Sequence, residues 1–150
     1  MSIAISLHIL AAVIWVGGMF FAYVALRPVA ASQLEPPVRL TLWASVFARF
    51  FPWVFICIAI LLGTGFWMIS LMGGMAAIGP HIHIMLLVGI IMILLFLHVY
   101  FGPFKKLKTN TLLEDWPAAG TALNKIRKLI LVNLALGLLV VVIASAGRFL

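Results

Sequence analysis

Apolar residues occur along this chain in four long blocks, and polar or charged residues are concentrated in the gaps between the blocks. A helix that crosses a membrane needs about 20 apolar residues to match a hydrocarbon core roughly 30 Å thick. The pattern therefore predicts an all-α fold, an integral-membrane four-helix bundle that forms a single transmembrane domain over residues 1–150. The predicted spans are Ile3–Leu26, Phe51–Met72, Ile82–Phe104 and Leu129–Gly147.

The composition agrees with a membrane protein. Of the 150 residues, 66% are hydrophobic and 9% are charged, against roughly 45–50% and 25% in an average soluble domain. The first block is much longer than the apolar core of a signal peptide, about 7–15 residues, and no basic residue precedes it. We therefore expect it to be a spanning helix, with the lipid bilayer as the surroundings of all four helices.

The basic residues are distributed unevenly between the gaps. The chain has ten Lys and Arg and three Asp and Glu, and nine of the ten cations fall in the connections 27–50 and 105–128, with Arg148 on the other side. Because cytoplasmic loops are enriched in Lys and Arg, we expect both connections in the cytoplasm and both termini on the periplasmic side of a bacterial inner membrane. We interpret Arg27, Arg49 and the lysines of 105–108 as membrane anchors. Cations grouped in this way do not indicate nucleic-acid binding.

The two basic connections contain further structural signals. Val38–Phe50 mixes apolar and basic residues, and we expect it to lie along the membrane surface as an amphipathic segment. Asp115, followed by Trp116 and Pro117, predicts the start of a helix that continues into the fourth span.

Small residues indicate which helix faces pack inside the bundle, because helices in lipid associate by close packing. In the first span, His8, Trp15 and Gly18 fall on one such face. In the fourth span, Asn133 belongs to the small-residue face, and we expect its amide to bond a neighbouring helix.

The histidines are the main candidates for chemistry, because ionisable groups inside a membrane are costly and are often functional. On the third span, His81 and Met85 share one face. His83 and His98 lie on nearly the opposite face, about 22 Å apart along the axis, so they cannot bind one ion together. His8 and His83 are expected at a similar depth near the outer side.

We predict His8, His83 and His98 as candidate ligands of a metal ion or of haem. Imidazole and thioether groups suit Cu(I), and two imidazoles can hold a haem iron. For each histidine, a hydrogen bond to a neighbouring helix is the simpler alternative. Catalytic residues are not identified, because no nucleophile with an adjacent base and no Asp or Glu lies within a span. Secondary candidates for a soft metal are His81, Met72, Met75 and Met85.

The first span and its exit, with His8, Trp15, Gly17-Gly18 and Arg27-Pro28, resemble the opening of the copper resistance D (CopD) family. His83 and His98 fit the order of the same superfamily, which also includes a membrane protoporphyrinogen IX oxidase associated with b-type haem. The oxidase relatives tend to have His-x-Lys at the start of the third span, where this chain has Met85 two residues after His83. This difference favours soft-metal chemistry.

Three functions are therefore compared. The first is copper binding and transport, in which copper meets the outer His and Met residues, passes to His8 and leaves past His98; a periplasmic copper carrier and a homodimer are its expected partners. The second is a haem b oxidoreductase, the expected class if the protein is an enzyme, in which His8 pairs with His83 or His98 and a quinone or porphyrin exchanges electrons. The third is a structural subunit of a larger membrane complex.

Overall fold

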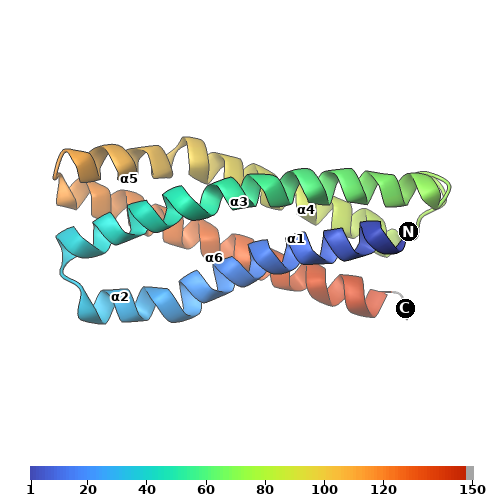
Figure 1. The fold of residues 1–150 in the computed structure, drawn as a ribbon, viewed down its shortest axis with the longest axis horizontal. Coiled ribbons are helices and arrows are strands. Elements are labelled where there is room, and N and C mark those ends of the chain that lie inside the picture. Colours follow the sequence, from blue (N-terminus) through green and yellow to red (C-terminus); the bar gives the residue numbers. More distant parts are fainter. Residues whose placement is uncertain (148–150) are drawn as a thin grey trace.

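The computed structural model describes residues 1–147, and every regular element within that range is a helix (Figure 1). Within these residues, four helical stretches are long and apolar enough to cross a membrane: Ser2–Gln33, Pro36–Leu71, Pro80–Leu112 and Trp116–Ala146. The prediction of an all-α protein with four spans is confirmed. Each stretch extends beyond the apolar block that predicted it, because the polar connections are also largely helical.

The first stretch changes its helical geometry part way along. Helix α1 (Ser2–Phe20) leads into a π-helical turn, η1 (Phe21–Leu26), and then into α2 (Arg27–Gln33). Pro28 stands in the first turn of α2. Proline has no N–H and its ring crowds the carbonyl group four residues earlier, and the wider turn directly before it relieves this conflict. The backbone N–H of Arg27 accordingly bonds the carbonyl oxygen of Ala22, five residues earlier.

Helix α3 (Pro36–Leu71) shows that the prediction for Val38–Phe50 was wrong. This segment does not lie along the membrane surface but is the first part of one continuous helix of 36 residues. Leu40, Trp43 and Phe47 are 3–6% exposed and stand at helical spacing. The same buried face continues through both halves of the helix, and its packing holds the basic segment in line with the span.

The third stretch is divided where a glycine precedes a proline. Helix α4 (Pro80–Phe101) ends at Gly102, and α5 (Pro103–Leu112) begins directly after it. The third span was predicted to continue to Phe104. It ends earlier because Pro103 provides no N–H for the α4 ladder and disfavours helical geometry in the residue before it.

Helix α6 (Trp116–Ala146) forms the fourth stretch and begins where the sequence predicted a helix start. The Asp115 side chain accepts a hydrogen bond from the backbone N–H of Ala118, 3.2 Å away. This cap satisfies one of the free N–H groups of the first turn. The helix runs from the basic connection through the fourth span without a break.

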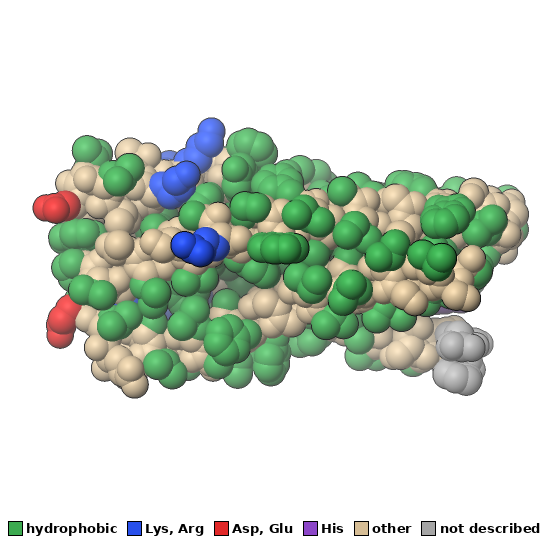
Figure 2. All heavy atoms as spheres, viewed as in Figure 1, with side chains coloured by type: hydrophobic (Ala, Val, Ile, Leu, Met, Phe, Trp, Pro, Cys, Tyr) green, Lys and Arg blue, Asp and Glu red, His purple; other side chains and the backbone are tan. Residues whose placement is uncertain are grey.

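The helices form one elongated bundle, with the start of α1, the end of α6 and the α3–α4 turn at one end (Figure 1). The α2–α3 and α5–α6 connections lie at the opposite end, and the Lys, Arg, Asp and Glu side chains visible in Figure 2 lie on that half of the molecule. Arg148 lies outside the described residues. The arrangement is compatible with the predicted orientation, and the assignment of the two ends to periplasm and cytoplasm stays a prediction.

The bundle buries aromatic rings in its interior and exposes aliphatic side chains on its outside. Phe51 stacks on Phe47 at a centroid distance of 5.1 Å and contacts Phe96 and Phe104 edge-on. Many large apolar side chains are exposed, as a lipid-facing surface requires. These side chains identify the lipid bilayer as the environment of the helices; examples are Ile3, Val13, Leu87 and Leu94, each 60–70% exposed.

Candidate metal site

His8 is held against α3 by a hydrogen bond inside the bundle. Its Nδ1 lies 2.8 Å from the hydroxyl oxygen of Thr64. Helix α1 packs against α3 along its length, and Gly65 leaves room for the imidazole at the point of contact: a Cβ at that position would lie 3.5 Å from Cε1 of His8. His8 is half-buried and Thr64 is 6% exposed. The histidine therefore sits at a helix–helix interface rather than facing lipid.

The hydrogen bonds of Thr64 favour one tautomer of the His8 ring. Its hydroxyl group lies 2.6 Å from the backbone carbonyl oxygen of Ile60, to which it donates. A hydroxyl has a single hydrogen, so its oxygen accepts the hydrogen of Nδ1 from His8. In the neutral imidazole, Nε2 of His8 is then the ring nitrogen with the lone pair. In metal sites the non-ligating ring N–H usually donates to such a partner, which fixes the ring and its tautomer.

The predicted soft-metal residues of the second span lie near the α3–α4 turn. Met72 follows the last residue of α3 and is 37% exposed, and Met75, within the turn, is 46% exposed. Thioether groups at these positions are accessible from outside the bundle. They lie at the same end of the molecule as the start of α1 (Figure 1).

The third span separates its histidines into two environments. His81 and Met85 are half-buried in the first turns of α4, and the Cβ of His81 packs closely against Gly147. His83 is exposed, and its Nδ1 lies 3.2 Å from the carbonyl oxygen of Gly79. His98 is also exposed, near the end of α4. The inward face of α4 is therefore the one that carries His81 and Met85.

The packing residues of the predicted site lie in the interior. Trp15 is 3% exposed and meets Phe96 edge-on at 6.2 Å. Gly18 faces the ring of Phe50, which occupies the space where a Cβ would stand. Asn133 is 5% exposed. None of these three carries a free ligand group toward His8, and their contribution is to bring the helices together.

The described residues contain no group of three or more His, Cys, Asp and Glu side chains that could hold a metal ion. Within one chain, a copper ion at His8 would therefore need thioether groups, backbone oxygens or groups of another molecule as additional ligands. The haem alternative needs His83 or His98 to face His8, and both histidines are exposed on α4. Nothing in residues 1–147 supports that pairing.

The sequence interpretation missed Thr64. The available signal was a hydroxyl side chain in the middle of an apolar span, where a polar group needs a partner. The partner could not be named, because spacing along one helix does not say which residue of another helix it meets.

Comparisons with known proteins give one match. The family model described as Copper resistance protein D matches residues 44–146, which include all of α4, α5 and α6 and the larger part of α3. No curated protein and no solved structure matches the chain. The matched region contains Thr64, His83 and His98, whereas His8 precedes it.

Proposed function

This chain belongs to the copper resistance protein D family, as predicted from its sequence, and we propose that it binds copper inside the bundle through His8 and carries copper across a bacterial inner membrane. The family and the four apolar spans make it a multi-pass membrane protein linked to copper resistance. The transport role and the ligand set are the proposal.

The observation that carries the proposal is the chain of hydrogen bonds from His8 to Thr64 and from Thr64 to Ile60. In the neutral imidazole these bonds leave Nε2 as the ring nitrogen with a lone pair, and neutral imidazole is the ligand form for copper. Here one nitrogen is fixed and the other is left with a lone pair.

The proposed route uses the histidines and methionines in order along the bundle. Copper first meets the groups at the α3–α4 turn and the start of α4, then His8, and finally His98 near the other end. The exposed His83 and His98 support a homodimer, in which α4 of each chain would contribute to a shared path. A periplasmic copper carrier would supply the ion. The first group of ligands comprises His81, His83, Met72, Met75 and Met85.

The test is Cu(I) binding by the detergent-purified protein, measured by competition with a chromogenic Cu(I) chelator. We expect His8→Ala to lose at least tenfold in affinity, and the neighbouring lipid-facing variant Ile9→Ala, at a position 56% exposed, to bind as the parent does. Equal binding by parent and His8→Ala overturns the role of His8. A Soret band in the parent that sharpens with dithionite, with about one iron per chain, overturns copper in favour of haem.

A further inference from the structure

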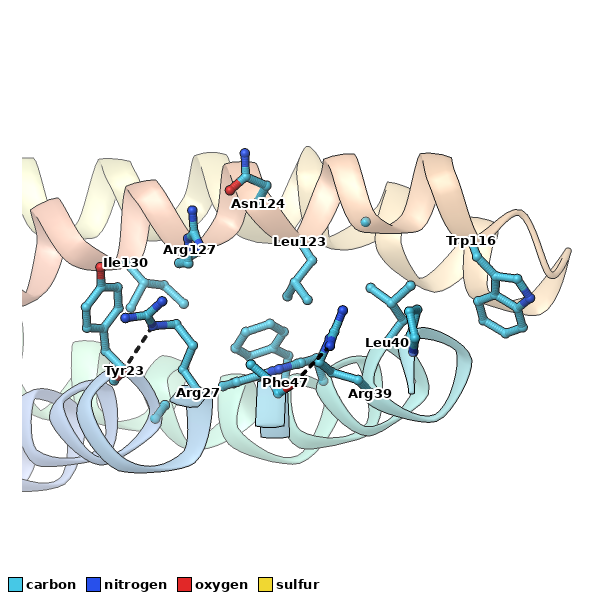
Figure 3. Close-up of a pocket in the computed structure, with 15 residues that line it drawn as sticks. Tyr23, Arg27, Arg39, Leu40, Phe47, Trp116, Leu123, Asn124, Arg127 and Ile130 are labelled. Carbon is cyan, nitrogen blue, oxygen red and sulfur yellow. Dashed lines mark hydrogen bonds between the residues drawn. The ribbon is translucent and has the colours of Figure 1, made fainter. Parts of the chain in front are cut away.

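A second potential site lies at the other end of the bundle from His8. A cavity of about 370 Å³ opens between η1, α2 and the start of α3 on one side and the first half of α6 on the other (Figure 3). Its volume falls in the range of ligand pockets, about 300–1,000 Å³. Tyr23 on its wall stands fifteen residues after His8, about 22 Å along the helix axis. The cavity is thus separate from the candidate metal site.

Three arginines line this cavity: Arg27 from α2, Arg39 from α3 and Arg127 from α6. In Figure 3 the guanidinium groups of Arg27 and Arg39 lie in the space between α6 and the helices opposite. The wall contains no Asp or Glu. Glu35, one turn before Arg39, is exposed and does not line the cavity. Three positively charged side chains therefore line the cavity, and no carboxylate lines it to balance them.

The local contacts of these arginines hold them in place but leave donors free. Arg27 packs over the ring of Tyr23 at 4.5 Å and bonds the Tyr23 carbonyl oxygen. One terminal nitrogen of Arg39 bonds the carbonyl oxygens of Ala31 and Leu34, where α2 turns into α3. A guanidinium has five N–H donors, so each of these side chains keeps donors for an anion.

The rest of the wall is aromatic and aliphatic. Trp43, Phe47 and Trp116 line the cavity from α3 and α6. A free inorganic ion would leave these surfaces uncovered, whereas a molecule with an anionic group and an apolar part would contact both kinds of surface. The cavity lies at the basic end of the bundle, and we expect this end to meet the headgroup region of the bilayer, because Lys and Arg near helix ends extend to the interface.

We propose that this cavity binds the headgroup of an anionic phospholipid, with the phosphate held by Arg27, Arg39 and Arg127 and the glycerol and upper acyl chain against the aromatic wall. Guanidinium groups bind phosphate oxygens in pairs of parallel hydrogen bonds, and basic pockets between spanning helices bind lipid headgroups. The proposal does not depend on copper binding.

The experiment is native mass spectrometry of the detergent-purified full chain with added phosphatidylglycerol or phosphatidylcholine. We expect phosphatidylglycerol to bind at least tenfold more tightly than phosphatidylcholine. Arg39→Gln should lower the affinity for phosphatidylglycerol by about tenfold. The matched control is Arg49→Gln, which removes an exposed arginine of the same helix outside the cavity wall and should bind as the parent does.

Arg127→Gln provides a second variant if Arg39→Gln fails to fold. Within residues 1–147, Arg127 has no hydrogen-bond or salt-bridge partner, so its removal should leave the fold intact while weakening lipid binding by a similar factor. Equal binding of both lipids overturns the proposal, as does an equal loss in Arg49→Gln, which would indicate general surface charge. Displacement of the lipid by inorganic phosphate, with equal stabilisation of the protein by phosphate alone, would assign the cavity to a soluble anion and also overturn it.

Discussion

Asn133 donates a hydrogen bond from Nδ2 to the backbone carbonyl oxygen of Met92, 3.3 Å away, and this bond links α6 to α4 in the bundle interior. Oδ1 of the same amide has no partner within the described residues. A small cavity of about 20 Å³ borders Asn133, and a cavity of that size holds about one water molecule. The amide thus joins two spans through one N–H donor, while its carbonyl oxygen has no protein partner.

Replacing Asn133 with Ala should weaken the bundle slightly. Interhelical hydrogen bonds in membrane proteins contribute about 0.6 kcal/mol on average and at most about 1.7 kcal/mol, so the free energy of unfolding should fall by that amount. The free energy of unfolding can be measured by adding SDS to the protein in micelles of an uncharged detergent. Asn124→Ala, an exposed amide on the same helix, should cause no loss, and an equal loss in both variants would contradict a role for the Met92 bond.

At Gly137, α6 lies close to both α1 and α4. A Cβ there would lie 2.9 Å from a methyl group of Val16 and 3.2 Å from the terminal methyl group of Met92. Gly137→Ala should therefore overpack the interface and lower the free energy of unfolding by about 1–3 kcal/mol. Gly89→Ala is the control, because nothing lies within 4 Å of its added Cβ. The free energy of unfolding of Gly89→Ala should stay unchanged or rise by up to about 1 kcal/mol. If Gly89→Ala loses as much stability as Gly137→Ala, the packing argument is wrong.

The four spans could be predicted because runs of about 20 apolar residues are typical of membrane-crossing helices, but the ends of the helices could not. The prediction placed the start of the second span at Phe51, whereas α3 begins at Pro36. The residues that extend it, Trp43 and Phe47, are buried against neighbouring helices. Hydropathy averaged over a window of residues does not detect such tertiary packing.

The faces of α4 show a second limit of prediction from the sequence. Helical periodicity separated His81 and Met85 from His83 and His98, and the structure places the two sets in different environments. The sequence could not say which set faces inward, because lipid-facing and core-facing residues are both apolar in a spanning helix. Of the cavity arginines, Arg27 was interpreted as a membrane anchor, and Arg39 and Arg127 were counted only among the basic residues of the connections, since nothing in a single sequence brings Arg39 and Arg127 to one cavity.

Thr64→Val tests whether the hydroxyl group positions His8 for copper. Valine keeps the shape but cannot accept the Nδ1 hydrogen, so the ring loses its fixed tautomer and orientation. Loss of such a supporting partner lowers metal affinity by about 10–100-fold, and we expect a decrease of that size in Cu(I) affinity with the fold retained. Thr121→Val is the matched control, because Thr121 is exposed and its hydroxyl also bonds a carbonyl of its own helix. If Thr64→Val binds Cu(I) as the parent does, the tautomer argument is wrong.

Cysteine labelling tests the predicted orientation of the bundle. Ala76 lies in the α3–α4 turn and Leu113 in the α5–α6 turn, and both side chains are exposed. If the basic end faces the cytoplasm, a membrane-impermeant maleimide should label Ala76→Cys in intact spheroplasts and Leu113→Cys only after lysis.

The parent protein is an internal control for this labelling, because its single cysteine, Cys57, is 2% exposed inside α3 and should not react. The predicted orientation rests on nine basic residues in two connections, because cytoplasmic loops are enriched in Lys and Arg. Labelling of Leu113→Cys in intact spheroplasts, with Ala76→Cys protected, would show that the bundle has the opposite orientation in the membrane. The Met and His residues of the α3–α4 turn would then face the cytoplasm, and the proposed route would carry copper in the opposite direction.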